Sequence, residues 1–311
     1  MLERLFGNEA LRRDLGKALA DGTLPPALLL CGAAGLGKNY AARLIAADAL
    51  YPQGGPGAQA VLEGRSPECL IVSPDGKKNI IPVAAVRTMR SALHATSLSA
   101  EGRAAVLEDA GRMEPPAANA LLKILEEPPE GVLFVLAADS EAAVLPTIRS
   151  RCALYTLAPL TAAECARQLT ARGAAAHDAA LLAAVYGGAY GLCLAALEPR
   201  RRAQLDAALE FVRRGAAGDR FGLMAALAGY ESRDDRTAAF DFLFDLQQIC
   251  AAALEGRTLP GRGAVSRAAA AAALPAVLEA GRRLTAFGSP KLVFSLLAQR
   301  FADAFAANPT R

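Results

Sequence analysis

The stretch GAAGLGKN, residues 32–39, constrains the fold of this 311-residue chain more than any other stretch. It follows a short apolar run at 27–32 and opens a segment with helical periodicity at 38–50. Glycines in such a loop let backbone N–H groups turn inward, and the N-terminus of the following helix attracts an anion. The pattern predicts a phosphate-binding loop between a strand and a helix. Its candidate nucleotide-binding residues are Gly32, Gly35, Gly37, Lys38 and Asn39.

The last position of this loop departs from the usual pattern, G-x-x-x-x-G-K followed by Ser or Thr. Lys38 is expected to lie against the β- and γ-phosphates of a nucleotide, but Asn39 replaces the hydroxyl that ligates Mg²⁺. The Asn amide oxygen is carried on a longer, differently aimed side chain. A glycine turn that binds no ligand is the alternative interpretation. We expect weak binding of ATP or ADP at most, and no required cofactor.

An acidic pair is the second element that nucleotide hydrolysis needs. In the usual order, Asp and then Glu, the Asp holds the waters of the metal and the Glu polarises the attacking water. Here VLEDAGRM supplies Glu108 and then Asp109, so one side chain is a methylene too long and the other too short. A misplacement of that size can cost about a hundredfold in rate. A solvated acidic strand end is the alternative interpretation of this altered pair.

Strand and helix patterns alternate through residues 1–160. Short apolar runs predict strands, and the amphipathic segments between them predict helices. This alternation is typical of a parallel sheet with helices on both faces, an α/β nucleotide-binding core. After the run at 27–32, the predicted strands are 69–74, 103–109, 132–138 and 152–157, and the predicted helices include 82–93 and 115–127.

The strand patterns stop after residue 160. Residues 161–197 predict two or three short helices, with GGAYG at 187–191 as a break between the last two. Further helices are predicted at 200–214, 219–229, 233–254, 264–284 and 290–306. We therefore expect three domains: a core at 1–160, a small helical domain at 161–199 and an all-α domain at 200–311.

Composition and cysteine spacing exclude several classes of protein. The formal net charge of +3 is close to neutral, so it neither announces nor excludes a nucleic acid. The six cysteines stand singly, and no CxxC pair marks a zinc or redox site. We expect reduced thiols, a cytoplasmic location and no metal. No apolar run is long enough for a membrane span.

Two motifs identify a family. The segments ANALLKILEEPPEGVLFVLAA and LPTIRSRCALYTLAPL resemble the clamp-loader branch of the AAA+ ATPases, in which N-A-L-L-K-x-L-E-E-P-P and S-R-C are highly specific. The resemblance covers the whole chain. It implies an AAA+ core, a helical lid and a C-terminal helical collar through which subunits form a ring. GSPKLVFSLLAQRF, residues 288–301, resembles a helix of that collar.

The resemblance also shows further departures from a working ATP site. Clamp-loader motors carry a polar sensor residue where this chain has Ala138, and a lid Arg where it has Gly191. Many family members have a four-cysteine zinc module, of which only Cys69 remains, so no zinc is expected. With Asn39 and the reversed acidic pair, four ATP-site elements depart together. The resemblance therefore implies a subunit that does not hydrolyse its own nucleotide.

The intact S-R-C motif implies a role in a neighbouring subunit. In this family the Arg, here Arg151, reaches the neighbour's ATP site, where a guanidinium neutralises charge on the γ-phosphate. A surface Arg at the start of a strand is the alternative interpretation. The implied partners are gamma/tau-like motor subunits, a delta-like subunit, the sliding clamp and, through the assembled complex, primer–template DNA. Candidate DNA-facing residues are Lys77, Lys78 and Arg87, for each of which a solvated charged face is the alternative.

Two other functions are open on the sequence. One is an active clamp-loader motor of the gamma/tau type, or a related AAA+ ATPase, that tolerates Asn39; Ala138 and Gly191 disfavour it. The other is a small-molecule P-loop kinase, in which the all-helical C-terminal third would have no use. The reading that we adopt is a non-hydrolysing subunit of the bacterial clamp loader, which serves DNA polymerase III in replication. It would complete the loader ring and donate Arg151.

Overall fold

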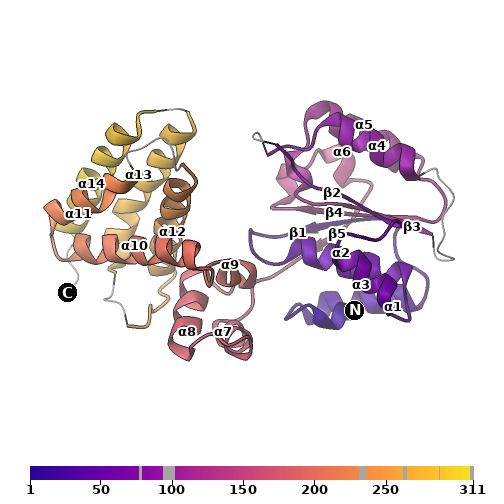
Figure 1. Cartoon of the computed structure of the whole chain (residues 1–311), viewed down its shortest axis with the longest axis horizontal. Coiled ribbons are helices and arrows are strands. Elements are labelled where there is room, and N and C mark those ends of the chain that lie inside the picture. The colour runs from indigo at the N-terminus through magenta and orange to yellow at the C-terminus, as the bar shows by residue number, and fades with distance from the viewer. Residues whose placement is uncertain (77–78, 94–101, 231–235, 262–264, 287, 309–311) are drawn as a thin grey trace. The chain divides into compact units, whose positions relative to one another are not determined.

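The computed structural model describes residues 1–76, 79–93, 102–230, 236–261, 265–286 and 288–308 (Figure 1). The chain divides into two compact units, Met1–Leu160 and Thr161–Arg311, which are described separately below. The further division that we expect at residues 199 and 200 stays a prediction.

The first unit is built on a five-stranded parallel sheet with the order β2-β3-β4-β1-β5. Because the sheet is covered on both faces, alternate residues of one strand enter two different cores. In β4, Phe134 and Leu136 enter one core and Leu133 and Val135 the other. The strands are β1 (Ala27–Cys31), β2 (Cys69–Val72), β3 (Arg103–Leu107), β4 (Val132–Ala138) and β5 (Ala153–Thr156).

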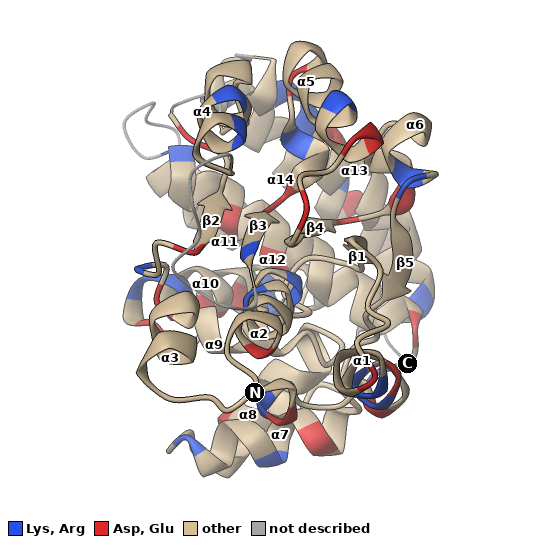
Figure 2. Cartoon of the chain, turned by 90° about the vertical axis from the view of Figure 1, so that its right-hand side faces the viewer, with Lys and Arg blue, Asp and Glu red and all other residues tan. Residues whose placement is uncertain are grey.

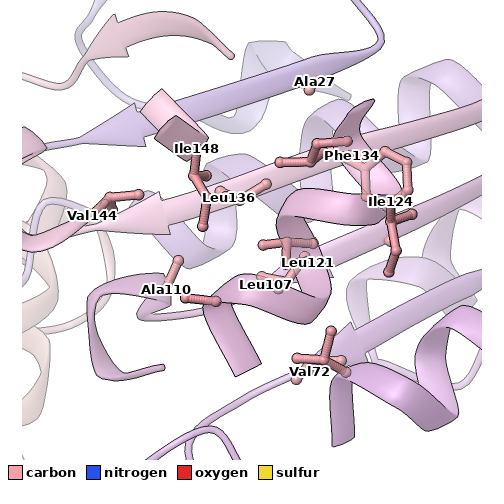
Figure 3. Close-up of a cluster of buried hydrophobic side chains, with 14 of the residues drawn as sticks. Ala27, Val72, Leu107, Ala110, Leu121, Ile124, Phe134, Leu136, Val144 and Ile148 are labelled. Atoms are coloured by element: carbon pink, nitrogen blue, oxygen red, sulfur yellow. The ribbon is translucent and has the colours of Figure 1, made fainter. Parts of the chain in front are cut away.

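Helices cover each face of this sheet. On one face Leu121 and Ile124 of α5 and Ile148 of α6 pack against Phe134 and Leu136 (Figure 3). That face is covered by α4 (Val83–Leu93), α5 (Pro115–Glu126) and α6 (Pro146–Arg149). The other face is covered by α1 (Glu9–Ala20), α2 (Lys38–Leu50) and α3 (Pro56–Leu62). The predicted α/β core, a parallel sheet with helices on both faces, is confirmed.

Two local features differ from the sequence predictions. The helix α3 lies in the segment 51–68, for which we predicted no regular element; it begins at Pro56 and packs against α2. The strand β3 ends at Leu107, two residues before the predicted end, and Asp109 has a left-handed backbone with φ 49°. The acidic pair therefore lies in the turn that follows the strand and not within it.

The second unit is helical throughout its described residues. Its first helices are α7 (Ala162–Ala171), α8 (Ala176–Val185) and α9 (Tyr190–Ala195). They are followed by α10 (Pro199–Ala216), α11 (Arg220–Leu227), α12 (Arg236–Leu254), α13 (Arg267–Thr285) and α14 (Pro290–Ala307). Phe211 of α10 forms the centre of an aromatic core, with ring centroids 5.6 Å from Phe242 and 4.8 Å from Phe301. The helical C-terminal region that we predicted is confirmed.

Most apolar residues of α14 are buried within the second unit. Phe294 and Leu297 are buried, and only Leu292 is largely exposed, at 72%. The sequence predicts an apolar stripe on this helix, and α13 and α11 cover most of it. An amphipathic helix has the same sequence pattern whether its apolar face packs against its own chain or against a partner protein. The pattern alone therefore does not tell which of the two buries that face.

A buried ion pair joins three helices of the second unit. Asp245 of α12 is fully buried and accepts hydrogen bonds from Arg201 of α10, at 2.9 and 3.2 Å, and from the hydroxyl of Tyr186 at 2.8 Å. Tyr186 directly follows α8. A buried carboxylate needs such partners, because an unpaired charge in the interior is very costly. The three side chains therefore fix the packing of α8, α10 and α12.

Candidate functional site

The glycine loop has the conformation that a phosphate-binding loop requires. Gly37 caps the N-terminus of α2 with a left-handed backbone, φ 82°, which a residue with a Cβ adopts only at a cost. Gly32 lies so close to β5 that a Cβ there would be 2.9 Å from the carbonyl oxygen of Leu157. The loop thus follows β1 and opens α2, as the sequence predicts.

The lysine of the loop is bonded to its own chain. Lys38 is 5% exposed, and its Nζ donates hydrogen bonds of 2.9 Å to the carbonyl of Ala33 and to Oδ1 of Asp139. Asp139 directly follows β4 and was not singled out in the sequence. Its carboxylate partly neutralises the charge that would attract a phosphate.

Asn39 stands where the usual loop pattern has a hydroxyl. Its Oδ1 is buried and has no hydrogen-bond partner among the described residues. A buried acceptor left unpaired costs about 1–3 kcal/mol. The glycines and the N-terminus of α2 offer backbone N–H groups suited to a phosphate.

The two acids of the pair, Glu108 and Asp109, lie in different environments. Glu108 is 7% exposed: its Oε1 accepts from Arg43 (2.6 Å to Nη2, 2.8 Å to Nε), and its Oε2 accepts from the hydroxyl of Ser73 at 2.7 Å. Asp109 lies next to it on a left-handed backbone. Both Glu108 oxygens are thus bonded within the chain, at the place where the usual order has the metal-holding Asp. The sequence reading missed Arg43, which α2 carries on the side that packs against β3.

The two other departures from the motor pattern are found on regular elements. Ala138 is the last residue of β4 and is fully buried, so no polar side chain projects from this strand end. Gly191 lies in the first turn of α9, which begins at Tyr190, so the break that we predicted at 187–191 ends earlier than expected. Neither position offers a polar side chain to a nucleotide.

Arg151 lies at the surface of the first unit, between α6 and β5. Its side chain is 36% exposed; Nη2 donates to Oε1 of Glu126 at 2.8 Å, and Nη1 donates to the carbonyl of Thr147 at 2.9 Å. Arg149, two residues earlier, lies 3.6 Å from Glu141 instead. Burial raises the pKa of the Cys152 thiol to about 11, so the last residue of S-R-C is a neutral packing group.

The candidate DNA-facing residues are only partly described. Arg87 is exposed on α4, a helix with basic segments in Figure 2, and Arg90 is exposed on the same helix. Lys77 and Lys78 lie outside the described residues. Arg87 and Arg90 are three residues apart, so they share one face of α4.

The cysteines occur in apolar surroundings. Burial raises the pKa of Cys69, the one cysteine that remains of the family's zinc module, to about 12.

Within the described ranges, no three His, Cys, Asp or Glu side chains gather in a way that could hold a metal ion. No helix in the part of the chain that the structure describes is long and apolar enough to cross a bilayer.

Comparison with known proteins places this core in one family. Residues 7–161 match the family described as DNA polymerase III, delta subunit. Over 175 residues the chain is 33% identical to DNA polymerase III subunit delta' of Escherichia coli (strain K12), covering 55% of this chain and 52% of that protein. It is 31% identical over 157 residues to subunit gamma/tau of Mycobacterium bovis, covering 47% of this chain and 27% of the relative. The chain thus spans about half of that delta' relative's length and less of the gamma/tau relative.

A solved structure resembles more of the chain. The gamma subunit-related protein of DNA polymerase III from Thermotoga maritima covers 93% of this chain and 98% of its own, with a TM-score of 0.48 and 16% identity. By its sheet order and its glycine loop, the chain is an α/β protein of the P-loop type with a helical second unit. Its first unit belongs to the family described as DNA polymerase III, delta subunit, and is similar to bacterial delta' subunits.

The bond between Lys38 and Asp139 leads to a prediction about nucleotide affinity. We expect Asp139→Asn to tighten binding of ATP and ADP by up to about fivefold, because a partly exposed ion pair of this kind is worth up to about 1 kcal/mol. Calorimetric titration of both proteins with each nucleotide measures the change. The gain should disappear when Lys38→Ala is added, and equal affinities of Asp139→Asn and the unchanged chain would contradict this role of Asp139.

Proposed function

We propose that this chain is a non-hydrolysing subunit of the bacterial clamp loader, which completes the loader ring and donates Arg151 to the ATP site of a neighbouring subunit. The observation that carries the proposal is the state of Glu108. Glu108 stands where the usual order has the Asp that holds the waters of the metal, and both of its oxygens are engaged by Arg43 and Ser73. The shorter Asp109 stands where that order has the Glu that polarises the attacking water. The chain's own acidic pair is thus altered at both places, whereas Arg151 is partly exposed at the surface.

The chemistry offered by Arg151 is electrostatic. Phosphoryl transfer places growing negative charge on the γ-phosphate oxygens and the leaving group, and a planar guanidinium neutralises it through paired hydrogen bonds. Such a contribution from a neighbouring subunit changes turnover by several orders of magnitude in other nucleotide-hydrolysing systems. The neighbour holds the nucleotide and the metal, and this chain supplies only the cation.

The partners follow from this role. They are the gamma/tau-like motor subunits, a delta-like subunit and, through the assembled complex, the sliding clamp and primer–template DNA. The helical second unit would serve as the collar through which the subunits assemble. Arg87 and Arg90 on α4 would contribute to a sequence-independent grip on phosphates, which weakens as salt is raised.

The isolated chain tests the first half of the proposal. We expect no ATP hydrolysis above background in a steady-state phosphate-release assay. The variant Asn39→Thr should be equally inactive, because it restores a hydroxyl but leaves Glu108 bonded to Arg43. Steady turnover that disappears in Lys38→Ala would show instead an active motor, the main alternative function. Co-purification with gamma/tau-like and delta-like subunits tests the assembly.

A further inference from the structure

Arg151 is held from two sides by groups of its own chain. Glu126 is the last residue of α5, and its Oε1 accepts from Nη2 of Arg151 at 2.8 Å. Ile124 of α5 and Ile148 of α6 share one buried core, which fixes the end of α5 beside the turn that carries Arg151 (Figure 3). The carboxylate is therefore delivered to the guanidinium by rigid elements, 25 residues apart in sequence.

The second contact uses a carbonyl at the end of a short helix. The four-residue helix α6 leaves carbonyls without helical partners, and that of Thr147 accepts from Nη1 of Arg151 at 2.9 Å and from the hydroxyl of Ser150 at 3.1 Å. Both contacts orient the first two residues of S-R-C. The two Arg151 contacts lie on different nitrogens, so together they fix the plane of the guanidinium.

The remaining donors of Arg151 are available to a ligand. A guanidinium has five N–H donors, and the contacts found within the described ranges use one on Nη1 and one on Nη2. The side chain is 36% exposed, and its three other N–H groups make no hydrogen bond within the described ranges. That number suffices for a bidentate contact with a phosphate while both internal contacts persist.

We propose that Glu126 is the positioning residue of Arg151, an inference that rests on the function proposed above. An exposed Arg side chain has many rotamers, and ordering it at the moment of reaction opposes catalysis. Glu126 and the Thr147 carbonyl order the guanidinium before the neighbouring subunit docks. The Glu126 carboxylate also lowers the net charge of the pair. It leaves the other N–H donors of Arg151 unbonded, so the guanidinium can still contact a phosphate.

The test is a double-mutant cycle in the assembled complex. Glu126→Ala should lower DNA-stimulated ATP turnover by roughly threefold to tenfold at the one site that Arg151 faces, with little change in KM, because the finger acts on the transition state. Glu126→Gln keeps an acceptor oxygen at the same place and should retain more than about half of the turnover. In an Arg151→Ala background, Glu126→Ala should cause no further loss. Glu127→Ala, an exposed acid on the next residue, is the matched control and should leave turnover unchanged.

The outcomes separate this inference from the proposed function. Normal turnover in Arg151→Ala means that the finger itself is wrong. A loss in Arg151→Ala together with normal turnover in Glu126→Ala leaves the finger in place and overturns the role of Glu126. Higher turnover in Glu126→Ala, or a further loss in the Arg151→Ala background, likewise overturns positioning. Equal losses in Glu126→Ala and Glu126→Gln would contradict it too, because the amide oxygen keeps the contact.

Discussion

Replacing Arg151 by Ala is expected to lower ATP turnover of the assembled clamp loader at least about tenfold at the one site that the residue faces. The reason is that the Arg151 guanidinium is permanently charged and planar, and the nearby guanidinium of Arg149 lies beside Glu141 instead. Clamp loading by the complex should fall with it. The loss in total turnover will be smaller where other sites of the ring hydrolyse ATP independently. Arg151→Lys should rescue little, because an ammonium lacks the paired geometry.

A matched control is available two residues away. Arg149→Ala removes the same charge from the same surface turn, and its ion pair with Glu141 is long, at 3.6 Å, and exposed. We expect both variants to fold and to join the ring normally, since exposed ion pairs contribute little to stability. Only Arg151→Ala should slow turnover. Normal DNA-stimulated turnover and normal clamp loading with Arg151→Ala would reduce this subunit to a scaffold.

Replacing Asp245 by Ala is expected to destabilise the second unit by about 3–5 kcal/mol. The change leaves the Arg201 guanidinium and the Tyr186 hydroxyl without their shared acceptor in a buried place. The transition of this unit should move down by about 6 °C or more in a thermal melt. Hydrogen exchange in α8, α10 and α12 should accelerate, which assigns the loss to the helices that the ion pair joins.

The neighbouring acid of the same helix provides the control for this change. Asp241 lies 3.5 Å from the same Arg201 but is 27% exposed, and its removal should cost less than about 1 kcal/mol. Equal effects of Asp241→Ala and Asp245→Ala would mean that burial of Asp245 does not matter. An unchanged melting transition in Asp245→Ala would show that the ion pair is replaceable by water.

Local pattern was sufficient for most of the elements and for the family, although it missed α3. A glycine loop between an apolar run and an amphipathic helix depends only on neighbouring residues, and so does the alternation that predicts β4 and α5. The S-R-C motif and the L-E-E segment are likewise contiguous, so the resemblance to clamp-loader subunits could be drawn before any contact was known. The departures Asn39, Ala138 and Gly191 were visible for the same reason.

The chemistry of the site depends on contacts that the sequence does not encode locally. Lys38 meets Asp139 across 101 residues, Arg43 meets Glu108 across 65, and both distances in sequence are closed by the strand order β2-β3-β4-β1-β5. From spacing alone, Glu108 was a misplaced but available acid; in the tertiary structure it is a buried, bonded one. The sequence by itself determined that this chain has the outline of a phosphate-binding loop with Asn39 in place of the usual hydroxyl. Only the tertiary structure decided which groups Lys38 and Glu108 bind, because an ion pair forms where the folded chain brings opposite charges together, whatever their separation in sequence.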